Sequence, residues 1–278
     1  IDPDVRTSAA AALGKLKGRE PYVVQSLRPL TTDPHGQVRS AAWWALWKLA
    51  DDQRAIGQLI QLLADKDWMV NQAAGKYLAT IGSPAVRPLI DALKNSPQQG
   101  QAAAAESLAQ IGVAAQPAVV ALQPLLAHDQ VAVATAASRA LGQIGPAALP
   151  ALLQELTRNH PQGRLLAIEA IAAMGPPGAA AVPALIKRLN HPDQQTRRLS
   201  IKALGAIGPA ARAAVPELVK LLAANDADLR GATCQALGKL GSSAHSAQQL
   251  LEQLANQDPV DFVQRAARQA AQQLASQE

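Results

Sequence analysis

One thirteen-residue phrase, Val-Arg-x-x-Ala-Ala-x-Ala-Leu-Gly-x-Ile-Gly, returns along almost the whole chain. Its nine copies lie at Val5–Leu16, Val38–Leu49, Val70–Gly82, Gly100–Gly112, Val133–Gly145, Gly163–Gly175, Thr196–Gly208, Leu229–Gly241 and Val263–Leu274. We call the central Leu, Ile or Ala of each copy its anchor. The anchors are Leu13, Leu46, Leu78, Leu108, Leu141, Ile171, Leu204, Leu237 and Ala271, at steps of 33, 32, 30, 33, 30, 33, 33 and 34 residues. A period of this length without alternating β-branched runs predicts paired helices stacked in a row. We therefore expect one all-α solenoid of eight to nine helical hairpins over residues 1–278, because a single pair is too small to fold alone.

A second helical pattern separates the copies and supplies the other helix of each pair. It begins near a proline, at Pro88, Pro150, Pro183 and Pro216. Proline suits a helix start, where its missing N–H costs nothing, and we expect Pro124, later in its segment, to kink its helix. The glycines that close the phrase fit a left-handed helix cap; they are Gly82, Gly112, Gly145, Gly175, Gly208 and Gly241.

Composition argues against several classes of function. Hydrophobic residues make up 49% of the 278 residues but aromatic residues only 3%, with a single Phe, whereas an enzyme core of this size usually buries several. The net charge of +5 is spread evenly, with 13 basic and 11 acidic groups in residues 1–139 and 13 and 10 in residues 140–278. Nucleic-acid binders usually concentrate Lys and Arg on one face, so a nucleic-acid partner is not expected.

The sequence contains few signals of where the protein is located. No apolar run reaches the roughly 20 residues that cross a bilayer, so we expect no membrane span. Cys234 is the only cysteine, which excludes a disulfide within one chain and favours a reducing, cytoplasmic compartment. The chain starts at Ile1 instead of Met, so a removed N-terminal targeting segment stays open.

The phrase and its proline partner resemble the HEAT-repeat family, in particular the HEAT-like repeats of phycobilisome lyases and so of cyanobacteria. The resemblance covers about residues 5–274 and implies a solenoid with the proline helices outside, on the convex side, and the Val-Arg helices inside. The first repeat then lacks its outer helix. The last helix carries Arg265, Arg268, Gln269, Gln272 and Gln273, a polar surface suited to a C-terminal cap. Such repeats serve many unrelated partners.

Stacked copies can be compared position by position. Four residues before the anchor every copy has a small residue, namely Ala9, Ala42, Ala74, Ala104, Ala137, Ala167, Ser200, Thr233 and Ala267, which predicts close helix packing. Two residues before the anchor most copies are polar or charged, so this position faces water and Trp44 is predicted to be exposed. Trp47 stands where seven of the eight other copies have Gly or Ala, so either its neighbours open to hold it or it protrudes.

Seven residues before the anchor, copies one, two and six to eight have an arginine, and copies three to five have another residue. The arginines are Arg6, Arg39, Arg164, Arg197 and Arg230. In HEAT-like proteins such an Arg pairs with carboxylates of the turns, and the resemblance implies Asp4, Asp33, Asp193 and Asp228 as partners here. The loss of this arginine in repeats three to five has two interpretations. It is neutral drift, or it gives a middle part of the solenoid that bends when a partner binds.

The candidate binding site is a cluster of aromatic residues. All four tryptophans lie within residues 43–68, with a tyrosine and two lysines nearby, a composition that is typical of a binding hot spot. The predicted partner-binding residues are Trp43, Trp44, Trp47, Lys48, Trp68, Lys76 and Tyr77. The alternative is structural, in which the tryptophans fill a gap or cap the N-terminal end.

A secondary basic patch comprises Lys187, Arg188, Arg198 and Lys202, next to Arg197 and Arg212, with Asp193 the one acid among them. It could meet an acidic protein surface or phosphate, or it could be an ordinary solvated face.

Catalytic chemistry has little support in the sequence. The five His lie a repeat or more apart, none at a metal-ligand spacing, and no carboxylate pair stands out as acid and base. Cys234 falls in a column of small residues, which predicts a packed, inert thiol. We expect no catalytic residue, no metal and no cofactor.

Three functions remain open. The leading hypothesis is a non-catalytic scaffold that binds a partner protein near the Trp cluster. The alternative is a bilin lyase or phycobilisome-associated chaperone, because Ala41-Ala42-Trp43-Trp44 resembles a phrase of phycobiliprotein lyases. That family usually has Tyr just before the phrase, whereas here Arg39-Ser40 precede it. A HEAT-like DNA glycosylase would need an Asp beside the Trp residues, and the inner helix that bears them contains none; Asp51 and Asp52 follow its end.

Overall fold

A computed structural model describes residues 2–16 and 21–276, in which every regular element is an α or a 3₁₀ helix. The all-α solenoid expected from the repeat is confirmed. The chain forms two compact units, Ile1–Ala140 and Leu141–Glu278, whose boundary falls within α9 (Val131–Ile144). One uninterrupted array over residues 1–278 stays a prediction.

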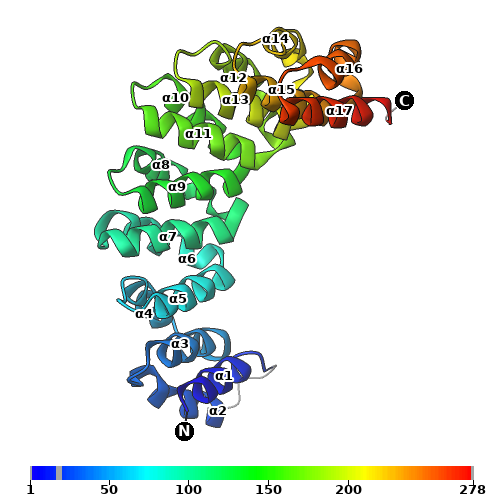
Figure 1. Cartoon of the computed structure of the whole chain (residues 1–278). Helices are drawn as coiled ribbons and strands as arrows, with labels where there is room; N and C mark the ends of the chain where they lie inside the picture. The colour runs from blue at the N-terminus through cyan, green and yellow to red at the C-terminus, as the bar shows by residue number, and fades with distance from the viewer. Residues whose placement is uncertain (1, 17–20, 277–278) are drawn as a thin grey trace. The chain divides into compact units, whose positions relative to one another are not determined.

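Unit 1 consists of two layers of helices (Figure 1). The repeated phrase forms the helices α1 (Pro3–Leu13), α3 (Gly36–Ala50), α5 (Trp68–Ile81) and α7 (Gln98–Ile111), and each packs on the next. We call these, with α9 and their counterparts in unit 2, the Val-Arg helices. The second layer contains α2 (Pro21–Leu27), η1 (Arg28–Thr32), α4 (Arg54–Leu62), α6 (Ser83–Asn95), η2 (Gly112–Ala118), α8 (Val119–Leu122) and η3 (Gln123–Ala127).

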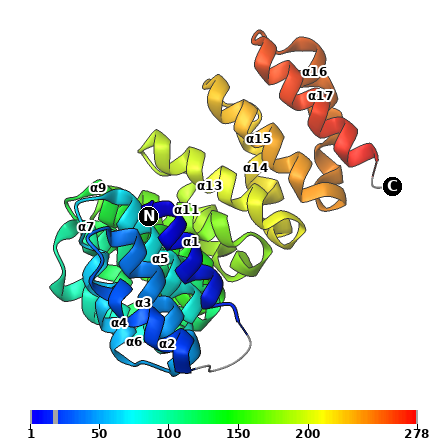
Figure 2. The ribbon, with the colours of Figure 1, turned by 90° about the horizontal axis from the view of Figure 1, so that it is seen from below.

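Unit 2 repeats this arrangement. Its Val-Arg helices α11 (Pro161–Met174), α13 (Gln194–Ile207), α15 (Ala227–Leu240) and α17 (Asp261–Ala275) lie side by side in order, and Figure 2 shows the last three clearly. The second layer contains η4 (Gly145–Ala148), α10 (Leu149–Thr157), η5 (Pro176–Ala181), α12 (Val182–Arg188), η6 (Gly208–Ala214), α14 (Val215–Leu221), η7 (Gly241–Ala247) and α16 (Gln248–Gln257). The polar face expected of α17 is exposed at Arg265, Arg268, Gln269 and Gln272.

Small residues meet where successive Val-Arg helices approach each other, since a Cβ built on Gly205 would lie 2.9 Å from Ala236 Cα, and the predicted column of small residues lies in the interior of the same stack. All its members are buried except Ala9, because no helix precedes α1 in the described residues. Ser200 and Thr233 fit this apolar interface because their hydroxyls donate to the carbonyls of Thr196 and Leu229, one turn back, at 2.8 and 2.7 Å. Small side chains therefore allow the close approach on which the stack rests.

The closing glycines have the expected positive φ but not the expected left-handed ψ. Gly82 has φ 77° and ψ −134°, and Gly241 has φ 60° and ψ −145°. These angles lie in the mirror image of the β region, which only glycine adopts readily. The next helix begins at or directly after these glycines.

The prolines mark helix starts in three of the four predicted places. Pro150, Pro183 and Pro216 occupy the first turns of α10, α12 and α14. Pro88 is an exception and lies inside α6, because Pro84 already starts that helix one turn earlier. At Pro124 the expected break is present, since α8 ends and the 3₁₀ helix η3 begins around it.

The arginine column joins neighbouring repeats at both ends of the chain. Arg6 donates to both carboxylate oxygens of Asp33, at 2.8 and 3.0 Å, and Arg230 binds Asp258 in the same way at 2.7 and 2.8 Å. Arg39 lies 3.6 Å from Asp65. Each partner lies in the turn of the following repeat, so the column links one hairpin to the next.

Only Asp33 among the implied partners is therefore correct. Asp193 accepts hydrogen bonds from the backbone N–H and the hydroxyl of Thr196 and caps α13 instead. Arg197 donates to the carbonyls of His191 and Pro192, both at 2.8 Å. Asp4 and Asp228 are wrong because the carboxylates that Arg6 and Arg230 bind lie one repeat further on.

One segment is long and apolar enough, by composition, to cross a membrane, contrary to expectation. It covers the 30 residues Gln98–Ala127, within which an 18-residue window has a mean hydropathy of 1.3. It folds as a helical hairpin, since α7 ends at Ile111 and Gly112 has φ 67°. A bilayer needs about 20 residues in one continuous helix, which this segment does not provide.

Gly82 and Gly57 form a matched pair for testing the glycine caps, because a Cβ at either position would meet no atom within 4 Å. Gly57 lies inside α4, so Gly57→Ala should raise the free energy of unfolding by about 0.5–1 kcal/mol. Gly82→Ala should lower it by about 1–3 kcal/mol, because alanine is strained at a positive φ. Urea unfolding followed by circular dichroism measures both, and equal stabilities would mean that the cap does not need glycine.

The Arg6–Asp33 pair predicts a pH dependence of stability. The hydrogen bonds from Arg6 lower the pKa of the Asp33 carboxyl from 3.8 to about 2, against the opposing effect of burial. A lowered folded-state pKa stabilises the fold above pH 4, and this contribution is lost as the pH falls from about 4 to about 2. Asp33→Asn should therefore be less stable than the wild type at pH 7, with the difference closing over that interval in thermal melts. Asp91→Asn, which removes an exposed ion pair with Arg87, should follow the wild-type profile.

Candidate functional site

The predicted aromatic cluster divides into buried and exposed parts. Trp44 is only 6% exposed, so the prediction that it faces water is wrong. Its ring stacks on Tyr77 of α5, with ring centroids 5.1 Å apart and planes at 23°. Burial raises the pKa of the Tyr77 hydroxyl above its ordinary value of 10, as expected for a ring that lies against this core.

A missing side chain on the preceding helix explains the burial of Trp44. A Cβ built on Gly14, at the end of α1, would lie 2.6 Å from the Trp44 ring, so the indole occupies the space that a side chain there would take. The ring joins the buried cluster of Ala10, Leu27 and Ala45. Trp44 therefore fills a gap between α1 and α5 and offers no free surface to a partner.

The other residues of α3 are only partly accessible. Trp43 is half-buried against the same cluster, and the Arg54 guanidinium of α4 lies 5.9 Å from its ring centroid, a cation–π contact within the hairpin. Trp47 is half-buried and Lys48 is exposed on the last turn of α3. The structural interpretation thus accounts for Trp43 and Trp44 and leaves Lys48 as a surface residue.

Trp68 differs from the other tryptophans because it is 63% exposed. It starts α5 and, together with Lys76, lines a groove of about 970 Å³ between α5, α7 and α9 in unit 1. We call this the amide groove, because carboxamide side chains make up most of its polar lining: Asn71, Gln72, Gln98, Gln99, Gln110 and Gln130. Of the predicted partner-binding residues, the structure brings only Trp68 and Lys76 together here.

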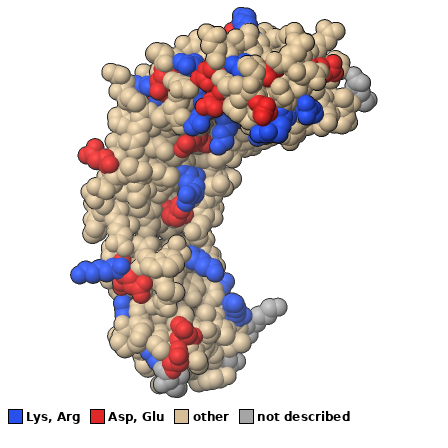
Figure 3. All heavy atoms as spheres, in the orientation of Figure 1, with Lys and Arg blue, Asp and Glu red and all other residues tan. Residues whose placement is uncertain are grey.

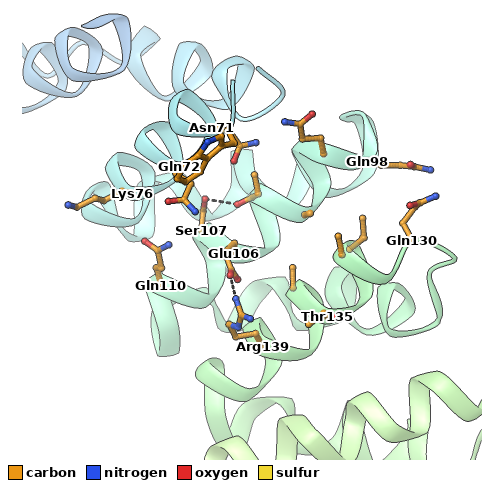
Figure 4. A pocket seen from close by; sticks show the side chains of 18 residues that line it. Asn71, Gln72, Lys76, Gln98, Glu106, Ser107, Gln110, Gln130, Thr135 and Arg139 are labelled. Carbon is orange, nitrogen blue, oxygen red and sulfur yellow. Dashed lines mark hydrogen bonds and ion pairs between the residues drawn. The ribbon is translucent and has the colours of Figure 1, made fainter. Parts of the chain in front are cut away.

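Figure 4 shows how the amide groove is arranged. Gln98 and Gln130 lie towards one end, and Lys76 and Gln110 towards the other. Between them Arg139 of α9 forms an ion pair with Glu106 of α7, which leaves the groove close to neutral. The floor is of small residues such as Ala102, Ala103 and Ala136.

Most of the carboxamides are available to a ligand. The side chains of Gln72, Gln98, Gln110 and Gln130 are exposed and make no hydrogen bond with other described residues. Gln99 donates to the Asp65 carbonyl at 2.8 Å, which still leaves its side-chain oxygen as an acceptor. Sequence reasoning missed these residues; the available signal was the run of uncharged polar residues at exposed positions of the third to fifth copies.

The predicted basic patch also divides. Arg198 and Lys202 lie on the exposed face of α13 and, with Lys239, line a groove of about 410 Å³ between α13, α15 and α17. Lys187 and Arg188 lie on α12 in the other layer, where Arg188 donates to the Leu156 carbonyl at 2.6 Å. Figure 3 shows Lys and Arg side chains gathered along the edge of unit 2 formed by the Val-Arg helices.

Groups capable of catalysis are sparse in the described part of the chain. Cys234 is fully buried, and burial raises the pKa of its thiol to about 12, as expected for an inert residue. Residues 2–16 and 21–276 contain no group of three or more His, Cys, Asp or Glu that could hold a metal ion.

These helices and their packing define an all-α repeat protein. A family model for HEAT repeats matches residues 24–109, 86–172, 149–214 and 182–272. The chain therefore belongs to the HEAT-repeat family, as the phrase indicated. A search of curated proteins found no match.

Solved structures of similar fold include two karyopherins. Kap95p, solved with RanGDP, is 15% identical with a TM-score of 0.64, over 100% of this chain and 44% of that one. Kap121p, bound to the extreme C-terminus of the phosphatase Cdc14p, is 14% identical with a TM-score of 0.60, over 99% and 36%. The CpcE–CpcF phycocyanin lyase complex from Nostoc sp. PCC7120 is 22% identical with a TM-score of 0.49, over 55% and 98%. At these identities the likeness shows the fold alone.

The lyase-like phrase has a packing role in this chain. Ala41, Ala42 and Trp44 are buried and Trp43 is half-buried, so the phrase presents little surface that could cradle a tetrapyrrole. Bilin binding stays an untested alternative without a residue-level site in α3.

Trp44 and Trp68 provide a test of the division between structural and accessible aromatics. Trp44→Ala should lower the free energy of unfolding by about 3–5 kcal/mol, because it leaves a cavity between α1 and α5. Trp68→Ala should change it by no more than about 0.5 kcal/mol, because the ring is exposed. Urea titration of both variants measures these values; a large loss of stability in Trp68→Ala would make that residue structural.

Proposed function

We propose that this chain is a protein-interaction scaffold that binds a polypeptide segment in the amide groove, with Trp68 as the anchor. The exposure of Trp68 at the groove carries the proposal. Tryptophan is among the side chains that contribute most to binding when a partner buries them. Within the predicted cluster, Trp44 is buried and Trp47 half-buried on α3, so Trp68 at the start of α5 is the residue that we expect a partner to cover.

The carboxamides suit a polypeptide ligand. Each side chain of Gln72, Gln98, Gln110 and Gln130 offers both a donor and an acceptor, the pair needed to match the N–H and C=O of a peptide backbone. The ion pair between Glu106 and Arg139 leaves no large net charge in the groove, so binding there should tolerate neutral sequences.

One solved structure of similar fold contains a bound polypeptide segment of the kind proposed here. Kap121p was solved with the extreme C-terminus of Cdc14p, which is a terminal polypeptide segment bound by an all-α array. A ligand of the same kind, a flexible segment and not a folded domain, fits a groove of about 970 Å³.

A peptide-display selection on the immobilised full chain tests the proposal. Selected peptides, resynthesised with a fluorophore, should bind the wild type and lose about tenfold or more in affinity for Trp68→Ala, equal to about 1.4 kcal/mol. Gln72→Ala and Gln110→Ala, each made alone, should weaken binding by a smaller factor, about fivefold, because one neutral hydrogen bond contributes about 1 kcal/mol.

Val120→Ala is the matched control, because Val120 is 82% exposed in the same unit but lies on α8 in the other layer. It should bind the selected peptides as the wild type does. Equal loss in both variants, or peptides insensitive to Trp68→Ala, would contradict the assignment of the groove. Binding of an open-chain tetrapyrrole in place of any peptide would favour the lyase-like alternative.

A further inference from the structure

A second groove, in unit 2, differs in chemistry from the amide groove. It lies between α13, α15 and α17 and is lined by three cations, Arg198, Lys202 and Lys239, and one carboxylate, Asp228, a net charge of +2. None of the three cations forms an ion pair with the described residues. Arg198 donates to the Gln195 side chain at 2.8 Å, a neutral partner. We call this the basic groove.

The three cations form a row along α13. Arg198 and Lys202 are four residues apart, so they lie on one face of the helix at a spacing of about 6 Å. Lys239 comes from α15, but its stem crosses towards α13: a Cβ built on Gly205 would lie 3.7 Å from Lys239 Cδ. The positive charges therefore follow the helix from Arg198 past Lys202 to Gly205.

This spacing matches one kind of ligand. In an extended chain, side chains on the same side repeat every two residues, at about 6.6–6.8 Å. An extended segment with acidic residues at alternate positions would place its carboxylates opposite the row. Charge-assisted hydrogen bonds of this kind are about twice as strong as neutral ones.

The ends of the groove favour a polypeptide over a nucleic acid. Asp228 repels any anionic group placed beside it, but it can accept a hydrogen bond from a peptide N–H, a donor that a sugar-phosphate backbone lacks. Phe262 of α17 lies over Gly231, where a Cβ would be 2.6 Å from its ring, and stays 39% exposed. Its free face offers an apolar contact beside the charges.

From this geometry we propose that the basic groove binds an extended acidic segment of a partner protein, with carboxylates at alternate residues on Arg198, Lys202 and Lys239. The site is separate from the amide groove, so the proposal does not depend on the function assigned to unit 1. It also reduces the predicted basic patch to two of its members and adds Lys239.

The test uses the full chain and fluorescent peptides of about eleven residues in which Glu alternates with Ser, read by fluorescence anisotropy. We expect binding that weakens about tenfold or more in Arg198→Ala/Lys202→Ala/Lys239→Ala, and that falls steeply with salt. The matched control, Lys187→Ala/Arg212→Ala/Lys220→Ala, removes the same charge from the other layer of unit 2 and should change affinity less than about twofold. Circular dichroism checks that both variants fold.

A charge reversal distinguishes loss of the site from loss of the fold. Arg198→Glu/Lys202→Glu/Lys239→Glu should gain binding of a peptide in which Lys alternates with Ser, which an unfolded variant cannot do. Three results would overturn the proposal: no binding of the acidic peptide at about 1 mM, equal loss in both triple variants, or tighter binding of oligo(dT) than of the peptide. The last result would make the groove a nucleic-acid site.

Discussion

Close packing between successive Val-Arg helices within each unit supports the other features of that unit. The contact is made of alanine and of hydroxyl residues whose O–H groups are satisfied one turn back, so little volume separates the helices. Because each hairpin is stabilised mainly by its neighbours, positions that face water are free to vary from copy to copy. The amide groove and the basic groove are built from those positions, on one scaffold and with different chemistry.

The ends of the helices are fixed by other means. Glycines with positive φ close the Val-Arg helices, and Arg6, Arg39 and Arg230 reach forward to aspartates in the next turn. In the third repeat Asn71 takes the arginine position and donates to the Leu63 carbonyl of its own preceding turn. The side chain there no longer links two repeats, and the same stretch of chain carries the amide groove.

Sequence reasoning predicted the fold well because it depends on a period, which a single chain displays nine times. It failed at Trp44 because comparing copies shows which residue types a position accepts and does not show where a large side chain will lie; here the indole lies over Gly14 and stacks on Tyr77. Of the implied arginine partners only Asp33 was right, and Asp65 and Asp258 were missed, because spacing in sequence does not show which turn lies beside which helix. The grooves depend on separations between helices, so only their exposed residues could be anticipated.

The distribution of tryptophan gives the protein a built-in optical label. All four indoles lie between residues 43 and 68, within unit 1, and unit 2 has none. Tryptophan fluorescence consequently reports on the N-terminal unit alone, whereas the circular dichroism of the peptide backbone reports on both units. Whether the two halves melt together or one after the other can be read by overlaying the two signals on the unmodified chain.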